Sequence, residues 1–81
     1  MTTQDDIRGW FERGVNDKAM FMFVICDMFD WDDYPAYYYS VENALVRKNK
    51  YVEMEKIMEI YDLREPMEPQ LNKPRNFAEL K

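Results

Sequence analysis

The stretch Phe21–Tyr39, which reads FMFVICDMFDWDDYPAYYY, decides the fold of this 81-residue chain. Two runs of apolar and aromatic residues flank an acidic turn, a pattern typical of a β-hairpin. Successive side chains of a strand point to opposite faces of a sheet. The first run is apolar on both faces, with Phe21, Phe23 and Ile25 on one and Met22, Val24 and Cys26 on the other. This strand is therefore predicted to be central in a sheet or covered on both faces.

The second strand is predicted to begin at Tyr34 and Pro35 and to run to Tyr39, after an acidic loop at 28–33. Proline has no backbone N–H, so Pro35 belongs at a strand start or at a sheet edge. The loop is longer than a tight two-residue turn, and loops of this kind on a rigid scaffold often carry function.

The segment before the hairpin, 1–17, is predicted to be a helix. Thr3 and Asp6 resemble a capping box, and the apolar residues recur at helical spacing, at Ile7, Trp10, Phe11 and Val15. Gly14 lies on or beside this apolar stripe, where a residue without a Cβ permits close packing, or else it lies near the helix end.

Ser40 is predicted to cap a second helical segment that extends over 41–62, either as one helix or as two with a kink near Asn49. The strongest helical pattern of the chain lies in its second half, at Met54, Ile57, Met58 and Tyr61.

These elements predict an α+β fold in the order helix, β-hairpin, helix, with both helices on one face of a small antiparallel sheet. Residues 1–63 form the single domain, and the proline-containing tail 64–81 is partly ordered or docks on a neighbouring chain. A chain this short buries a small core, and its single cysteine allows no internal disulfide. We therefore expect a homo-oligomer in which the second sheet face is covered by another copy of the chain.

Composition excludes several functional classes. The chain has no histidine, one cysteine and two glycines, so catalytic triads, classical zinc sites, P-loops and dinucleotide-binding loops are not expected. We predict no enzymatic activity, no cofactor and no metal site. The formal net charge of −5 argues against DNA binding through a basic surface. No apolar run is long enough to span a membrane, and the lone cysteine fits a cytoplasmic location.

The acidic turn is the strongest local signal, with Asp27, Asp30, Asp32 and Asp33 within seven residues. It is interpreted as a solvated turn that keeps the hairpin soluble, with cation binding and partner binding as alternatives. The neighbouring aromatic residues suit core packing and self-association, or stacking on a partner. A basic concentration at 47–50 is either a solvated helix surface or a receptor for phosphate. The candidate binding residues are Asp30, Trp31, Asp33, Tyr34, Tyr37, Tyr39, Arg47 and Lys48.

The pieces VICDMFDWDDYPAYYY and EKIMEIYDL resemble a group of small uncharacterised proteins encoded by tailed bacteriophages. The matching positions are Cys26, Asp27, Phe29, Asp30, Asp33, Tyr34, Pro35, Met58, Glu59, Tyr61, Asp62 and Leu63. The resemblance carries over no binding site. It implies a phage accessory factor, in the cytoplasm of an infected bacterium, that inhibits a host defence component.

Two modes of inhibition are open at this point. The protein binds a host protein, which an acidic aromatic surface favours, or it sequesters a phosphorylated nucleotide signal, which a basic aromatic cleft between subunits favours. The alternative function is a structural homo-oligomer that has no small-molecule ligand.

Overall fold

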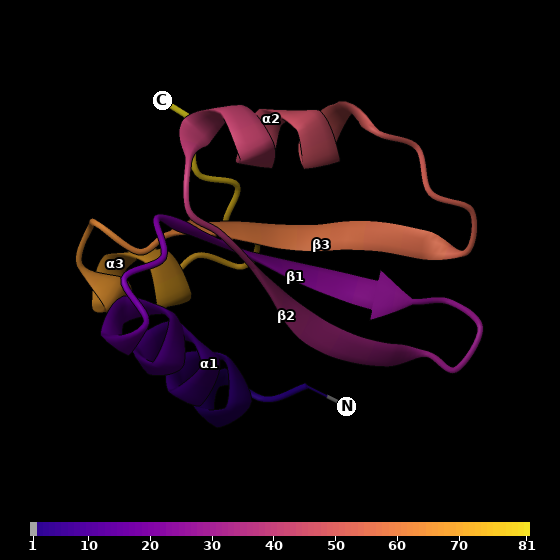
Figure 1. Cartoon of the computed structure of the whole chain (residues 1–81). Helices are drawn as coiled ribbons and strands as arrows, with labels where there is room; N and C mark the ends of the chain where they lie inside the picture. Colours follow the sequence, from indigo (N-terminus) through magenta and orange to yellow (C-terminus); the bar gives the residue numbers. More distant parts are fainter. Residues whose placement is uncertain (1) are drawn as a thin grey trace.

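A computed structural model describes residues 2–81 and shows a small α+β fold built on a three-stranded antiparallel sheet (Figure 1). The helix–hairpin–helix order of the prediction is confirmed for the first part of the chain, and a third strand and a short helix follow it. The elements in chain order are α1 (Gln4–Asn16), β1 (Phe21–Asp27), β2 (Asp32–Tyr38), α2 (Val41–Asn49), β3 (Glu55–Asp62) and α3 (Met67–Leu71).

Strand β1 is the central strand, and the strand order is β2-β1-β3. Its register with β2 runs from Phe21 opposite Tyr38 to Asp27 opposite Asp32. All residues from Phe21 to Cys26 are buried. The apolar character of both faces of this strand, visible in the sequence, therefore reflects its central position with cover on each side.

Strand β3 replaces the predicted helix over the second half of 41–62. Helix α2 ends at Asn49, and the apolar pattern that suggested helix lies in a strand that pairs with β1. A β-bulge explains the misleading spacing, because Val24 lies opposite Glu59 while Ile25 lies opposite Ile57. The extra residue, Met58, shifts the alternation by one position, so apolar residues three apart share a face.

The two faces of the sheet carry two separate apolar clusters. One lies under α1 and α3, and its buried members include Ile7, Phe11, Met22 and Tyr61. The other lies under α2 and is built on Phe21, Phe23, Ile25, Ala44 and Ile60. Figure 1 shows α2 on one side of the sheet and α1 with α3 on the other. The prediction that both helices lie on one face is therefore wrong, and the face left for a second copy is covered by α2.

Helix α1 begins as its sequence predicts. The Thr3 hydroxyl accepts from the Asp6 N–H at 3.2 Å, and the Asp6 carboxylate accepts from the Thr3 N–H at 3.1 Å, which completes the capping box. Gly14 is buried, and a Cβ there would lie 2.6 Å from Leu63 Cδ1 and 2.7 Å from Tyr37 Cε1. The missing Cβ therefore sets how closely α1 approaches the sheet.

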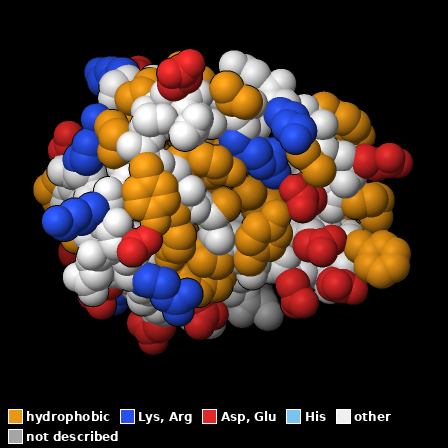
Figure 2. Space-filling model, in the orientation of Figure 1, with side chains coloured by type: hydrophobic (Ala, Val, Ile, Leu, Met, Phe, Trp, Pro, Cys, Tyr) orange, Lys and Arg blue, Asp and Glu red, His pale blue; other side chains and the backbone are white. Residues whose placement is uncertain are grey.

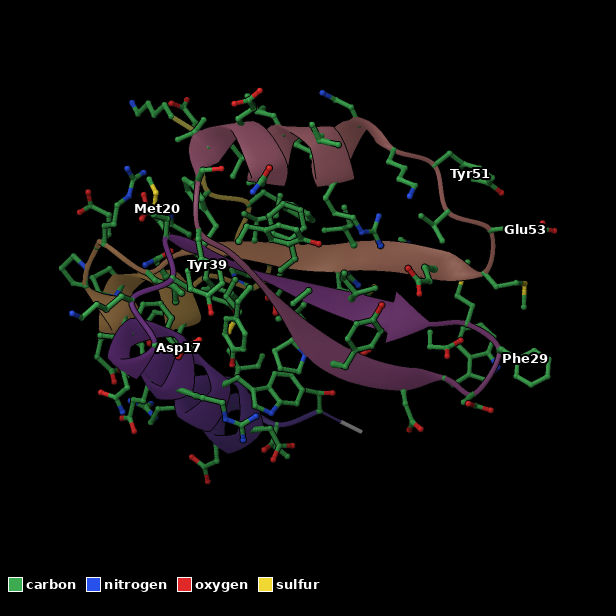
Figure 3. The ribbon with its side chains drawn as sticks, viewed as in Figure 1. Asp17, Met20, Phe29, Tyr39, Tyr51 and Glu53 are labelled. Atoms are coloured by element: carbon green, nitrogen blue, oxygen red, sulfur yellow. The ribbon has the colours of Figure 1, made fainter. Side chains whose placement is uncertain are left out.

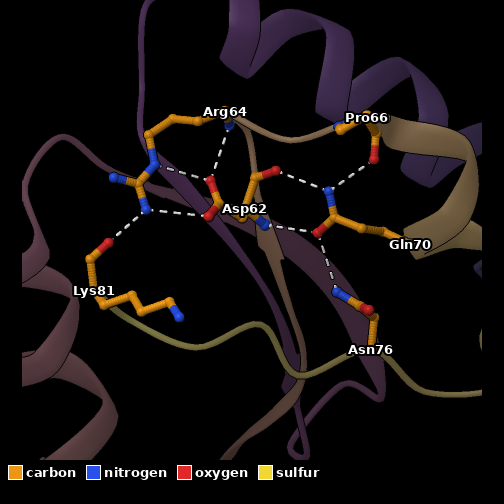
Figure 4. A network of polar contacts seen from close by, with 6 residues as sticks. All are labelled: Asp62, Arg64, Pro66, Gln70, Asn76 and Lys81. Atoms are coloured by element: carbon orange, nitrogen blue, oxygen red, sulfur yellow. Dashed lines mark hydrogen bonds and ion pairs between the residues drawn. The ribbon is translucent and has the colours of Figure 1, made fainter.

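The C-terminal segment is tied to β3 by a polar network (Figure 4). The buried Gln70 side chain accepts from the Asp62 N–H and donates to the Asp62 carbonyl, both at 2.8 Å. The buried Asn76 amide donates to the Ile60 carbonyl at 2.7 Å. Ile60 and Phe77 form an isolated parallel bridge along the outer edge of β3. Beyond it, Ala78 and Leu80 pack against the α2-side cluster.

Among residues 2–81, no helix is both apolar enough and long enough to cross a membrane.

Candidate functional site

Two loops meet at one end of the sheet. The β1–β2 loop (28–31) and the α2–β3 loop (50–54) are joined by a hydrogen bond in which the Met28 N–H donates to the Met54 carbonyl at 2.8 Å. Figure 3 shows Phe29 on the first loop and Tyr51 and Glu53 on the second, all at this end of the molecule and pointing away from the sheet. We call this region the acidic aromatic tip and define it by Phe29, Asp30, Trp31, Tyr51, Glu53 and Met54.

Large apolar side chains of the tip face solvent. The exposed fractions are 77% for Phe29, 74% for Trp31, 86% for Tyr51 and 45% for Met54. Single exposed apolar residues are ordinary on protein surfaces, but four of them on two neighbouring loops favour an interaction surface. The remaining aromatic side chains of the hairpin are more buried than Phe29 and Trp31, and the most exposed of them, Tyr39, is 50% exposed. Aromatic surface is therefore most available at the tip.

The backbone of the tip is held in an unfavourable conformation at two of these residues. Trp31 has φ 60° and Met54 has φ 64°, in the left-handed region that favours glycine. The Trp31 N–H donates to the Asp27 carbonyl at 2.6 Å, and the Phe29 N–H donates to the Asp27 carboxylate at 2.9 Å. These bonds fix the loop so that a bulky indole occupies a position where glycine would relieve about 1–2 kcal/mol of steric cost.

The charge at this end is predominantly negative. Figure 2 shows carboxylates gathered beside apolar side chains at the end where the two loops lie. Asp27 and Asp32 lie directly opposite each other in the hairpin, where like charges repel. Within residues 2–81, however, no three acidic, cysteine or histidine side chains are grouped in a way that would hold a metal ion. The acidic turn therefore presents a diffuse negative field.

A hollow of about 540 Å³ lies between the N-terminal part of α1 and the start of β2. We call it the tryptophan cleft; it is lined by Thr2, Asp6, Trp10, Trp31, Asp32 and Asp33. It adjoins the acidic aromatic tip and shares Trp31 with it. A second hollow of about 350 Å³ continues on the α1 side of the sheet and shares Thr2 and Asp33 with the cleft.

Asp33 forms part of the wall between these hollows. It lies opposite Cys26 in the hairpin register. Burial raises the pKa of the Cys26 thiol, and the carboxylate of Asp33 raises it further by accepting a hydrogen bond. A thiol with a raised pKa is less reactive at neutral pH, in agreement with the interpretation of Cys26 as a core residue.

The other sequence-predicted residues lie away from the tip. The Tyr34 hydroxyl donates to Glu55 at 3.0 Å, and Arg47 donates to the same carboxylate at 2.8 Å. Burial raises the pKa of Tyr34, and Glu55 raises it further. Lys48 is exposed on α2. The structure thus joins Tyr34 and Arg47 through Glu55 and leaves Lys48 apart.

Two tyrosines of the predicted site bind α1 and its C-terminal cap. The Tyr37 hydroxyl donates to the Trp10 carbonyl at 2.7 Å, and burial raises the pKa of this tyrosine. The Tyr39 hydroxyl donates to Asp17, and that hydrogen bond raises the Tyr39 pKa. These two residues attach the hairpin to α1.

Of the eight candidate residues, Asp30 and Trp31 lie in the tip, and Trp31 and Asp33 line the cleft. The site residues predicted from the sequence do not include Trp10, Phe29, Tyr51 and Met54. The sequence position of Phe29 indicated an exposed side chain, because an apolar residue in an acidic turn has no core to enter. The position of Trp10 gave no such indication, because its helical spacing fits a core position equally well.

Comparison with known proteins assigns no family to this arrangement. The chain showed no match to a protein-family model, to a curated protein or to a solved structure.

Proposed function

We propose that the chain is a non-enzymatic binding protein that docks its acidic aromatic tip on a basic protein surface. The observation that carries this proposal is the exposure of four large apolar side chains on two abutting loops, surrounded by carboxylates. Inhibition of a host defence component by such docking is the role that the phage resemblance favours.

The composition of the tip suits a protein interface. Trp and Tyr are enriched among the residues that dominate binding energy, because they bury a large area for few rotatable bonds. Trp31 and Tyr51 lie on loops that a hydrogen bond between Met28 and Met54 holds together. The surrounding negative charge accelerates encounter with a basic partner and disfavours acidic ones.

A protein target is favoured over a nucleotide signal by the distribution of charge. A phosphorylated ligand needs unpaired cations beside the aromatic surface. Arg47 on α2 is mostly buried and already paired with Glu55. The two loops carry Asp30 and Glu53 against a single exposed cation, Lys50. This distribution supports docking on a basic protein.

The test uses the purified chain as bait in lysate of a bacterial host, with the captured protein identified and then purified. The tip variant combines Phe29→Ala with Tyr51→Ala, and the matched control is Val46→Ala, which removes an exposed apolar side chain from α2. We expect calorimetry to give a Kd weakened at least about thirtyfold by the tip variant and unchanged by the control. Failure to capture a partner, or equal binding by the tip variant, would overturn the proposal.

A structural homo-oligomer is the second candidate, and one observation favours it. Strand β2 is an edge strand of the sheet, whereas the outer edge of β3 is partly covered by the C-terminal segment. An edge strand can pair with the edge of another copy. Light scattering measures the mass in solution, and a monomer at micromolar concentration would remove this candidate.

A further inference from the structure

The tryptophan cleft has a chemistry distinct from that of the rest of the surface. Both tryptophans of the chain, Trp10 and Trp31, line it, one from α1 and one from the hairpin loop. The faces of indole rings carry negative electrostatic potential and attract cations, with Trp the strongest of the aromatic residues. Two elements far apart in sequence thus bring both tryptophans to the lining of one hollow.

The charged residues of the cleft are all acidic. Asp6, Asp32 and Asp33 line it, and no Lys or Arg does. The ion pairs found within residues 2–81 involve none of these three carboxylates. Asp6 accepts one hydrogen bond from the Thr3 N–H through Oδ2. Among residues 2–81, therefore, three carboxylates line the cleft and no lining side chain carries a positive charge.

The dimensions indicate an organic cation. A metal ion needs several oxygen ligands within about 2.6 Å of one point. The carboxylates of residues 2–81 form no group of three that would hold a metal ion, and the hollow measures about 540 Å³. A side-chain cation on an extended stem suits an open hollow of this size, because carboxylates and indoles both line it.

We propose that the tryptophan cleft binds an arginine side chain of the protein on which the acidic aromatic tip docks. This inference rests on the proposed function and specifies the residue that the partner supplies. Guanidinium is planar, stacks on aromatic faces and bonds carboxylates with two parallel N–H groups, which ammonium does not. Trp31 belongs to both the tip and the cleft, so the arginine enters beside the apolar contact.

The position of Trp31 supports this assignment. Its φ of 60° is disfavoured for a bulky residue, and its side chain is 74% exposed, so the indole contributes little to the core. Strained residues of this kind cluster where binding is the reason for their retention. In this case the residue in the left-handed conformation is one that lines a hollow together with three acids.

Tryptophan fluorescence tests the inference directly, because both indoles of the chain lie in the cleft. The probe is the capped peptide Gly-Arg-Gly, and the control replaces arginine by citrulline, which has nearly the same shape without the charge. We expect a saturable change in emission with the arginine peptide, weakened by added salt, and at least tenfold weaker binding of the citrulline peptide. Equal binding of the two peptides, or no saturable change, would overturn the inference.

The paired variant is Asp32→Asn with Asp33→Asn, and the control is Glu12→Gln on the exposed side of α1. Asp32 faces Asp27 across the hairpin, so neutralising it relieves repulsion and the variant is expected to fold. We expect the paired variant to bind the arginine peptide at least tenfold more weakly than the wild type. The control is expected to bind it with unchanged affinity. An unchanged Kd in the folded paired variant would contradict the inference.

The tip variant separates this inference from the proposed function. Phe29→Ala with Tyr51→Ala leaves every residue of the cleft in place, so arginine-peptide binding is expected to persist while partner docking weakens. If the partner docks through the tip but the arginine peptide fails to bind, the cleft inference alone is wrong. If the peptide binds but the tip variant docks normally, the proposed function is wrong.

Discussion

At the scale of single residues, the two glycines of α1 predict opposite responses to the same substitution. Alanine at Gly14 places a Cβ 2.6 Å from Leu63 Cδ1 and 2.7 Å from Tyr37 Cε1. Leu63 is buried, and the Tyr37 ring is held by its bond to the Trp10 carbonyl, so neither moves freely. Overpacking of about 1–3 kcal/mol outweighs the helix-propensity gain of up to about 1 kcal/mol. We expect a net loss of about 1–2 kcal/mol in urea unfolding.

Gly9→Ala is the matched control on the same helix. A Cβ there meets no atom within 4 Å, so only the propensity gain remains, and stability is expected to rise by up to about 1 kcal/mol. Equal effects at Gly9 and Gly14 would show that close approach of α1 to the sheet is not what requires glycine.

At the scale of elements, Arg47 links α2 to β3. Its guanidinium donates to Glu55 at 2.8 Å, and both side chains are more than two-thirds buried. Arg47→Ala leaves Glu55 without this partner in a partly desolvated place, which costs about 1–2 kcal/mol. Lys48→Ala removes an exposed cation and is expected to change stability by less than about 0.5 kcal/mol. Thermal melts followed by circular dichroism compare the two, and equal melting temperatures would refute the link.

The error at β3 also belongs to this scale. Met58 and Tyr61 face α1, while Ile57 and Ile60 face α2, so each pair is separated by three positions. That spacing is the helical signature, but a bulge in a strand produces it by adding one residue to the alternation. The bulge depends on pairing with β1, which no local pattern reveals.

The hairpin and the capping box were predictable because their signals are local. The continuous apolar run from Phe21 and the hydroxyl of Thr3 act on neighbouring residues, and both predictions are confirmed. The tip and the cleft were not predictable in full. Tyr51 and Phe29 come to the same end of the sheet only because β3 pairs beside β1. Trp10 and Trp31 line one hollow only because α1 packs on the sheet.

At the scale of the whole molecule, buried phenols predict a loss of stability at high pH. Burial is the main cause that raises the pKa of Tyr61 above its ordinary value of 10.0, and Glu59 adds to it. The folded state then holds a proton that the unfolded state releases, so stability is full below about pH 10 and falls as pH rises above it. Burial also raises the pKa values of Tyr34, Tyr37 and Tyr38.

Urea unfolding between about pH 8 and pH 11 measures this fall, and Tyr61→Phe removes one contribution while keeping the ring. The variant is expected to lose less stability than the wild type over the same range. A steeper fall in the variant would contradict the assignment of the proton to Tyr61.

The left-handed backbone at Trp31 has a consequence for protein engineering. Selection for thermal stability alone favours glycine or asparagine there, because either relieves the backbone while giving up an indole that is mostly in solvent. For glycine, the steric relief of about 1–2 kcal/mol less the conformational entropy that glycine loses on folding leaves a gain of up to about 1 kcal/mol. The variant would lose one wall of the cleft. At this one residue, a substitution that raises stability is therefore expected to weaken binding.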